Sequence, residues 1–305
     1  MSRDNRLDSI KGVLIIFISN IPGGFPFLFA LFRRFRWLFL CFCAYFLLSL
    51  HGRSLDRGAR NVIFLQAGMA NNFFRFKQFT VYQDRCAMKV GTDGALLGAW
   101  AQGGARILDV GTGTGVVALM MAQRFPMATV HAVEVDPLAA GQANENVVAS
   151  PFADRVAVQL ASLQQWAADE SNGARYDAVV ANPPYFQQAL RCPDGSRSVA
   201  RHDVSLSYDD LFACTARLLT PTGVFTVVIP FDCLEALLKA SREHGFHLFR
   251  RCDVRTTPRK APRRHLLSFS LQPPTSPCLL EQGVIEDAPG HRSSWYAALL
   301  TDFYL

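Results

Sequence analysis

The stretch that decides the fold is Arg106-Ile107-Leu108-Asp109-Val110-Gly111-Thr112-Gly113-Thr114-Gly115, in which a five-residue segment runs directly into a glycine-rich loop. The first five residues predict a short buried strand, and the apolar residues from Val116 to Phe125 predict a helix after the loop. Glycine lets the backbone approach a ligand closely, and the N-terminus of a helix favours polar or anionic groups. The stretch therefore predicts a strand, loop and helix that bind a nucleotide-like ligand.

The spacing of glycines and acidic residues around this loop narrows the choice of ligand. The glycines fall at 111, 113 and 115, whereas the dinucleotide fingerprint G-x-G-x-x-G requires one where Val116 stands. A second strand, expected from Ala128 to Val133, ends at Glu134, whose carboxylate could bind ribose hydroxyls. Asp109 would repel a pyrophosphate but could hold the amino group of a methionine moiety. The pattern favours S-adenosylmethionine over NAD.

A second motif, Asn182-Pro183-Pro184-Tyr185, follows the apolar run from Tyr176 to Ala181, which predicts another buried strand. An exocyclic amine of adenine is a poor nucleophile, because its lone pair is delocalised into the ring. The side-chain oxygen of Asn182 and the carbonyl oxygen of Pro183 could accept its two hydrogens, and Tyr185 offers a flat surface for the base. Pro183 and Pro184 stiffen the turn. The motif predicts an amino-group methyltransferase site; a proline-rich turn that only ends a strand is the alternative.

Leu108 to Gly113 followed by Asn182 to Tyr185 resembles class I S-adenosylmethionine-dependent methyltransferases that modify amino groups. Other segments resemble a narrower family, the bacterial tRNA1(Val) adenine-N6 methyltransferases, over roughly Phe73 to Leu305. These segments are Phe74 to Phe79, Asp84 to Trp100, Ala200-Arg201-His202 and Asp302-Phe303-Tyr304-Leu305. The resemblance implies an enzyme that transfers a methyl group from S-adenosylmethionine to the exocyclic amine of the adenine just 3′ of the anticodon.

The resemblance also implies a cofactor site built from several segments. Its residues are Gly91, Thr92, Asp93, Asp109, Gly111 and Gly113 at the methionine end, Glu134 at the ribose, and Ser162 and Leu163 at the adenine ring. Many relatives carry an acidic residue at the place of Ser162, and a serine hydroxyl is a weaker, uncharged acceptor. For Thr92 and Asp93 the alternative role is capping of a helix expected from Gly94 to Trp100.

Alternating strands and helices predict an α/β fold, which the resemblance specifies as Rossmann-like, with a seven-stranded, mostly parallel sheet and helices on both faces. The further elements expected are a strand Val156 to Leu160, a helix Tyr208 to Leu219, a strand Gly223 to Ile229, a helix Leu234 to His244, and strands Phe246 to Cys252 and Leu266 to Leu271. The last two strands have no helix between them, which predicts a C-terminal antiparallel hairpin.

The first 68 residues differ in character from the rest of the chain. They hold apolar runs and basic clusters, and their longest run, Trp37 to Leu50, has 14 residues where a membrane-spanning helix needs about 20. They do not resemble a signal peptide. We expect residues 69–305 to form the methyltransferase domain, Met69 to be the true start and the enzyme to be cytoplasmic; a membrane anchor in residues 1–68 is the alternative.

The net charge of +6 arises in that extension, where nine Lys or Arg face three Asp, so residues 69–305 are neutral overall. Basic side chains nevertheless cluster after residue 250, and Arg201 follows the second motif. The candidate RNA-binding residues are Arg201, Arg251, Arg255, Arg259, Lys260, Arg263 and Arg264. Such residues bind phosphates without reading sequence; a solvated loop is the alternative. The expected partner is the anticodon loop of a tRNA, with no obligate protein partner.

Cysteines and histidines show no metal-binding spacing such as C-x-x-C or H-E-x-x-H, so no metal site is expected. Two other functions stay open on the residues alone. The two acceptors of the second motif also suit protein glutamine-N5 methyltransferases and DNA amino methyltransferases, although residues 69–305 leave no room for a separate DNA-recognition domain. A non-catalytic RNA-binding protein with the same fold is the other possibility.

Overall fold

The computed structural model describes residues 72–169, 175–183 and 206–305, all of which belong to one compact unit, Gly68–Leu305. The extension expected over residues 1–68 lies outside the described residues, so the start at Met69 stays a prediction. Within the ranges that the structure describes, the longest apolar helix is too short to cross a membrane.

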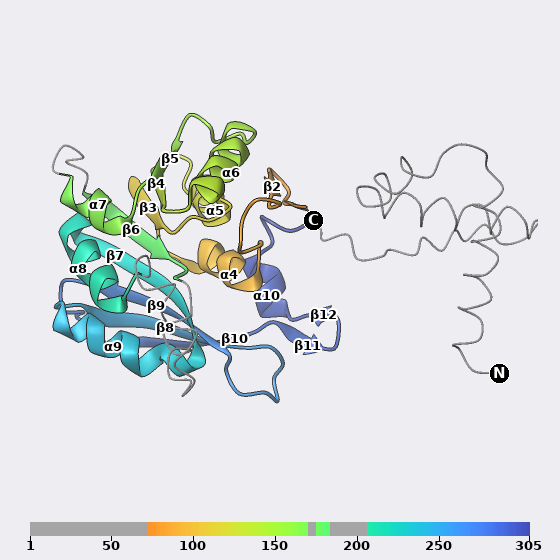
Figure 1. Ribbon diagram of the computed structural model, residues 1–305. Coiled ribbons are helices and arrows are strands. Elements are labelled where there is room, and N and C mark those ends of the chain that lie inside the picture. Colours follow the sequence, from red (N-terminus) through yellow and green to blue (C-terminus); the bar gives the residue numbers. More distant parts are fainter. Residues whose placement is uncertain (1–71, 170–174, 184–205) are drawn as a thin grey trace, which may run out of the picture. The chain divides into compact units, whose positions relative to one another are not determined.

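A single large sheet forms the centre of this unit (Figure 1). In spatial order its eight strands are β10 (Leu279–Val284), β8 (His247–Arg255), β9 (Arg264–Ser270), β7 (Leu219–Pro230), β6 (Tyr176–Ala181), β3 (Arg106–Val110), β4 (Thr129–Glu134) and β5 (Val156–Leu160). β9 runs antiparallel to both of its neighbours, and all other neighbouring pairs are parallel. The α/β class, the mostly parallel sheet and the C-terminal antiparallel hairpin, here β8 and β9, are confirmed.

The sheet has one strand more than the seven expected, because β10 pairs in parallel with β8 at its edge. The sequence of β10, Leu279-Leu280-Glu281-Gln282-Gly283-Val284, lacks an apolar alternation, and both leucines are exposed. Side-chain contacts hold it instead: Glu281 accepts hydrogen bonds from Trp100 Nε1 at 2.9 Å and from Arg250 Nε at 2.8 Å. The contact between Glu281 and Trp100, which is remote in the sequence, therefore helps to explain why this segment forms a strand.

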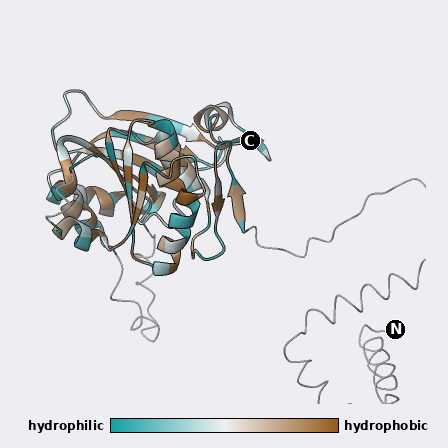
Figure 2. Cartoon of the chain, turned by 90° about the horizontal axis from the view of Figure 1, so that it is seen from above, coloured by the Kyte–Doolittle hydropathy of each residue, from teal (hydrophilic) through white to brown (hydrophobic). Residues whose placement is uncertain are grey.

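Helices cover both faces of the sheet (Figure 1). One face carries α4 (Thr92–Trp100), α5 (Val116–Arg124), α6 (Pro137–Val148) and α10 (Ser294–Leu299), and the other carries α7 (Leu163–Ala168), α8 (Tyr208–Leu218) and α9 (Leu234–Glu243). Each face has its own apolar cluster, and the strands between them are strongly hydrophobic (Figure 2). Burial on both sides explains why the central strands β3 and β6 read as apolar runs in the sequence.

The carboxyl ends of the parallel strands gather at one edge of the sheet. β8 is antiparallel to β9, as β7 is, so β8 runs in the same direction as β7, β6, β3 and β4. The loops that follow residues 110, 134, 181, 230 and 255 therefore meet at this edge, which is the usual ligand-binding edge of an open α/β sheet. Smaller elements flank it: β1 (Phe73–Arg75) with β2 (Thr80–Tyr82), β11 (Glu286–Ala288) with β12 (His291–Arg292), and the short helix η3 (Phe231–Cys233).

Candidate active site

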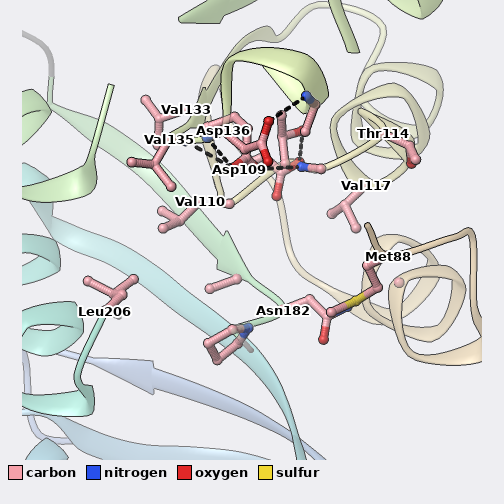
Figure 3. A pocket seen from close by; sticks show the side chains of 18 of the residues that line it. Met88, Asp109, Val110, Thr114, Val117, Val133, Val135, Asp136, Asn182 and Leu206 are labelled. Atoms are coloured by element: carbon pink, nitrogen blue, oxygen red, sulfur yellow. Dashed lines mark hydrogen bonds between the residues drawn. The ribbon is translucent and has the colours of Figure 1, made fainter. Parts of the chain in front are cut away.

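A pocket of about 820 Å³ lies at this edge, a volume within the range of small-molecule sites. It brings together the nine cofactor residues expected from the resemblance and the first two residues of the second motif. These residues are Gly91, Thr92, Asp93, Asp109, Gly111, Gly113, Glu134, Ser162, Leu163, Asn182 and Pro183. Figure 3 shows the pocket with Asp109 and Asp136 on one side and Asn182 and Leu206 on the other. The cofactor residues and the two motif residues come from five separate segments of the chain.

The glycine-rich loop has a backbone conformation that other residues rarely adopt. Gly111, Gly113 and Gly115 have φ values of 68°, 56° and 83°, in the left-handed region that favours glycine. The loop is held in place because the N–H groups of Gly111 and Thr112 both donate to the carbonyl oxygen of Val133. A Cβ atom on Gly111 or Gly113 would meet nothing within 4 Å, so glycine is needed there for its backbone conformation and not for lack of space. The free space also leaves the backbone open to a ligand.

Asp109 lies at the base of the pocket and is only 1% exposed. Its Oδ2 accepts hydrogen bonds from Thr112 Oγ1 at 2.6 Å and from the N–H of Ala118 at 3.1 Å, which ties β3 to the loop and to α5. Burial raises the pKa of Asp109 to about 7, although these two hydrogen bonds oppose the shift. A cationic ligand group beside it would favour the ionised form and lower that pKa.

Glu134, at the end of β4, organises two loops through its carboxylate. Its Oε2 accepts from the N–H of Gly113 at 2.8 Å, and its Oε1 accepts from the N–H groups of Val135 and Asp136 at 2.9 and 3.0 Å. Asp136 in turn caps α6 through hydrogen bonds from Leu138 and Ala139. Glu134 therefore sets the position of the glycine loop as well as lining the pocket.

Ser162 has a structural role beside its place in the pocket. It is the N-cap of α7: its Oγ accepts from the N–H of Gln165 at 3.1 Å, and its own N–H donates to Gln165 Oε1 at 3.0 Å. This reciprocal capping box accounts for a serine at this position. By contrast, the helix expected from Gly94 begins at Thr92 with Gly91 as its N-cap, so Thr92 and Asp93 lie in the first turn and are not the capping residues.

Asn182 and Pro183 follow directly after β6 and line the pocket together with Ala181. The strand register explains why these residues reach the pocket. β6 pairs with β3, and Ala181 lies opposite Val110, which is the residue before the glycine loop. The two motifs that the sequence separates by about 70 residues are thus adjacent strand ends. Pro184, Tyr185 and Arg201 lie outside the described residues, so their roles stay predictions.

Arg264 lines the pocket, although the sequence grouped it with the candidate RNA-binding residues. Its Nε lies 2.5 Å from Oδ1 of Asp93, and both side chains are largely buried, at 20% and 26% exposure. β9 begins two residues earlier than expected, which makes Arg264 a strand residue opposite Pro230 rather than a loop residue.

The other expected RNA-binding residues occupy different environments. Arg251 is paired with Asp253, its Nε lying 2.7 Å from Oδ1, and is half-buried. Arg255 ends β8 and is also half-buried. Three residues in the loop between β8 and β9 are exposed, namely Arg259, Lys260 and Arg263. The structure therefore divides the basic cluster into a half-buried part on the strands and an exposed part at the pocket edge of the sheet.

Several pocket residues were not among the site residues predicted from the sequence. They are Cys86, Ala87, Met88, Lys89, Asp136, Gln164, Leu206 and Asp210. Asp136 could have been found, because it follows a strand end next to Glu134; Leu206 and Asp210 reach the pocket only through the packing of α8. Burial raises the pKa of Cys86 to about 11, so its thiol stays protonated in the pocket. Among the described residues, no group of three or more His, Cys, Asp or Glu could hold a metal ion.

Comparison with known proteins agrees with this fold and pocket. The family described as "Methyltransferase small domain" matches residues 94–232. The structure of a predicted O-methyltransferase from Agrobacterium tumefaciens is similar with a TM-score of 0.56, covering 69% of this chain and 96% of that chain; at 18% identity this likeness concerns the fold alone. The protein is a class I S-adenosylmethionine-dependent methyltransferase.

Closer relatives define the family. A tRNA1(Val) (adenine(37)-N6)-methyltransferase of Bacteroides thetaiotaomicron is 47% identical over 240 residues, which are 78% of this chain and 99% of the relative. The enzyme of the same name from Cronobacter sakazakii is 44% identical over 240 residues, 78% of this chain and 96% of the relative. The chain belongs to the tRNA1(Val) (adenine(37)-N6)-methyltransferase family, and the resemblance noted in its sequence is confirmed.

Proposed function

We propose that this protein transfers a methyl group from S-adenosylmethionine to the exocyclic amine of adenine 37 of tRNA1(Val), the reaction that names its relatives. One observation carries the proposal for this chain: Asn182 and Pro183 line the same pocket as the glycine loop and Asp109. A target amine and a methyl donor can therefore meet in one cavity. The coverage of 99% of a relative's length supports the assignment of the whole reaction to this domain.

The pocket fits the cofactor by the chemistry of its lining. The carboxyl group of Asp109 is buried at the base and would hold the methionine ammonium, while the open backbone at Gly111 and Gly113 lets the methionine end approach. We assign the ribose to Glu134 and the adenine ring to the segment Ser162 and Leu163, with Gly91, Thr92 and Asp93 completing the methionine end. Bound there, S-adenosylmethionine supplies an electrophilic methyl group on a sulfonium.

The residues after β6 would prepare the nucleophile. Oδ1 of Asn182 and the carbonyl oxygen of Pro183 accept the two hydrogens of the adenine amine, which returns the lone pair to nitrogen and aims it at the donor. Pro183 and Pro184 limit the backbone of this turn, and Tyr185 stacks on the base. The nitrogen gains positive charge as the new N–C bond forms, while the bond between the methyl carbon and the donor sulfur would break with its electron pair staying on sulfur. The proton that the nitrogen loses afterwards is acidic enough to leave to water.

The basic loop between β8 and β9 would bind the tRNA backbone. Arg259, Lys260 and Arg263 are exposed at the edge of the sheet that holds Asn182. Arg255 stands at its start, and Arg251 and Arg201 would add further contacts to the RNA. An anticodon loop is single-stranded, so turning one adenine into the pocket costs less than opening a duplex. We expect the enzyme to act in the cytoplasm, because its tRNA substrate is found there.

The experiment compares wild-type protein with Asn182→Ala on total tRNA from a strain that lacks the gene, using labelled S-adenosylmethionine and identification of the modified nucleoside. Wild-type protein should produce N6-methyladenosine, and Asn182→Ala should lose transfer while still binding the cofactor. Asn144→Ala is the matched control, because Asn144 is exposed on α6 and does not line the pocket. Full transfer by Asn182→Ala, or methyl groups found only on protein or DNA, would refute the proposal.

A further inference from the structure

Phe231 is an exposed aromatic side chain at the edge of the sheet that carries the active site. It begins η3 directly after β7 and is 43% exposed. Its N–H donates to the carbonyl oxygen of Arg263 at 3.0 Å, and the residue before it, Pro230, pairs with Arg264 of β9. Since Arg264 lines the pocket, Phe231 stands immediately beside the pocket without being part of its lining.

The distance between Phe231 and the target site suits a neighbouring nucleotide. Val227 of β7 lies opposite Ala181 of β6, the residue before Asn182. Phe231 is therefore three positions further along its strand direction than Asn182, which corresponds to at most about 10 Å at the rise of a β-strand. A group at that offset lies beside the target site, where we expect the nucleotide next to the adenine.

The ring of Phe231 rests on a rigid support. It packs on the imidazole of His265 with the ring centroids 5.1 Å apart and the planes 31° from parallel. His265 is fully buried, and its Nδ1 lies 2.6 Å from Oδ1 of Asp253. Arg251 in turn donates to both carboxylate oxygens of Asp253 at 2.7 and 3.0 Å. This chain of contacts keeps the ring in one place while almost half of it stays open to a ligand.

Positive charge flanks the exposed ring. Arg263, whose carbonyl oxygen holds the backbone of Phe231, is itself exposed, and Arg259 and Lys260 lie in the same loop. A guanidinium group suits a phosphate, and a flat aromatic face suits a base, so together they match the two halves of a nucleotide. A single exposed phenylalanine needs no special explanation. Phe231, however, packs on a buried side chain, is next to Arg263 and stands at the edge of the sheet that carries the active site, and this combination indicates a ligand.

We propose that Phe231 stacks on the base of the nucleotide adjacent to the target adenine, while Arg263 binds a phosphate beside it. The subsite takes single-stranded RNA, and the inference rests on the proposed function because it needs an RNA substrate in the pocket. Stacking on a neighbour would hold the strand open while the target adenine leaves the stack. Phe231 is thus a positioning residue for the substrate rather than a catalytic one.

The test uses the full chain and an anticodon stem-loop RNA that contains the target adenine. Phe231→Leu keeps apolar packing on His265 but removes the stacking face, so the KM for RNA should rise about tenfold or more. The kcat and the KM for S-adenosylmethionine should stay within about twofold, and Phe231→Trp should restore the KM for RNA. Phe73→Leu is the matched control, because Phe73 is 42% exposed on β1 and does not line the pocket.

Abasic substitutions identify the stacked base. Two further RNAs lack the base on the 5′ side or on the 3′ side of the target adenine. With one of them, wild-type protein and Phe231→Leu should have the same KM for RNA, since the partner of the ring is already missing. If Phe231→Leu matches wild-type protein on intact RNA, or if neither abasic RNA removes the difference, the subsite does not exist. Absence of methylation by wild-type protein would instead refute the proposed function.

Discussion

Nε of Arg264 lies 2.5 Å from Oδ1 of Asp93, although these residues stand near opposite ends of the methyltransferase domain in the sequence. Asp93 is in the first turn of α4, and Arg264 is the first residue of β9. The ion pair joins the wall of the cofactor pocket to the hairpin whose loop carries the exposed basic residues. The residues proposed to bind the cofactor and those proposed to bind RNA are therefore joined by this ion pair.

A double-mutant cycle should show that this ion pair stabilises the fold. Asp93→Ala and Arg264→Ala each remove one partner of a largely buried ion pair, so we expect a coupling energy of about 1–3 kcal/mol in urea unfolding. The pair of Lys239 and Glu243 serves as the control. It lies on the surface of α9, its atoms are 3.8 Å apart, and its coupling should be below about 0.5 kcal/mol. Equal coupling in the two cycles would contradict the prediction.

The buried carboxyl group of Asp109 should make stability depend on pH. Unfolded, it titrates near 3.8, and in the folded protein its pKa is about 7 because of burial. Between these values the folded protein holds a proton that the unfolded chain releases. The contribution of this group to the free energy of unfolding is therefore fully present below about pH 4 and is lost as the pH rises through about 7.

Asp109→Asn isolates this effect, because asparagine stays neutral and keeps an oxygen that can accept from Thr112 and Ala118. The stability of wild-type protein relative to Asp109→Asn should fall by about 2–4 kcal/mol between pH 4 and pH 7 in urea unfolding. Saturating S-adenosylmethionine should move this fall to lower pH, since its ammonium favours the ionised carboxylate. Parallel stability curves for the two proteins would show that Asp109 does not titrate in this range.

Two glycines should respond differently to alanine substitution. Gly113 has a left-handed backbone but open space around its Cβ position, so Gly113→Ala should cost about 1–2 kcal/mol of stability through backbone strain and should weaken cofactor binding. At Gly98 a Cβ atom would lie 2.8 Å from atoms of Met120, where α4 packs on α5.

Gly98→Ala should therefore destabilise the protein by about 1–3 kcal/mol through overpacking, with cofactor affinity nearly unchanged. Thermal unfolding with and without S-adenosylmethionine, together with calorimetric titration, separates the two effects. The interpretation is wrong if Gly113→Ala binds the cofactor as tightly as wild-type protein.

The exposed basic loop should set the salt dependence of tRNA binding. If Arg259 and Lys260 each bind one phosphate as proposed, Arg259→Ala and Lys260→Ala should each decrease the slope of log affinity against log salt by about 0.7–0.9. Filter binding of tRNA at several salt concentrations measures this slope. Arg242→Ala is the control, because Arg242 is exposed on α9 outside the loop. An unchanged slope in the double variant would place tRNA on another surface.

Glu281 should hold the edge strand β10 in the sheet. Glu281→Ala removes the acceptor of Trp100 Nε1 and the ion partner of Arg250, so we expect a loss of about 1–3 kcal/mol in unfolding. Hydrogen exchange of the β10 amides should become faster in this variant. Glu235→Ala, at an exposed position in the first turn of α9, should change neither quantity. Unaltered exchange in β10 would show that backbone pairing alone retains the strand.

The sequence by itself determined the elements that form the pocket. β3, β5 and β6 begin and end at the predicted residues. For β3 and β6, which are largely buried, burial on both faces explains the apolar run. The glycine loop and Asn182 could be assigned to one site from their place after such strands, because the carboxyl ends of parallel strands share one edge. Local chemistry and periodicity were sufficient for these features.

Only the tertiary structure decided the features that depend on contacts between remote segments. The polar segment Leu279–Val284 becomes a strand because Glu281 meets Trp100 and Arg250, and Arg264 turns into the pocket because Asp93 faces it. Burial beneath the loop, which no local pattern reveals, raises the pKa of Asp109. Charge pairing, the choice of contact partner and the exclusion of solvent depend on residues that meet only in the folded protein. The spacing of residues along the chain therefore does not predict them.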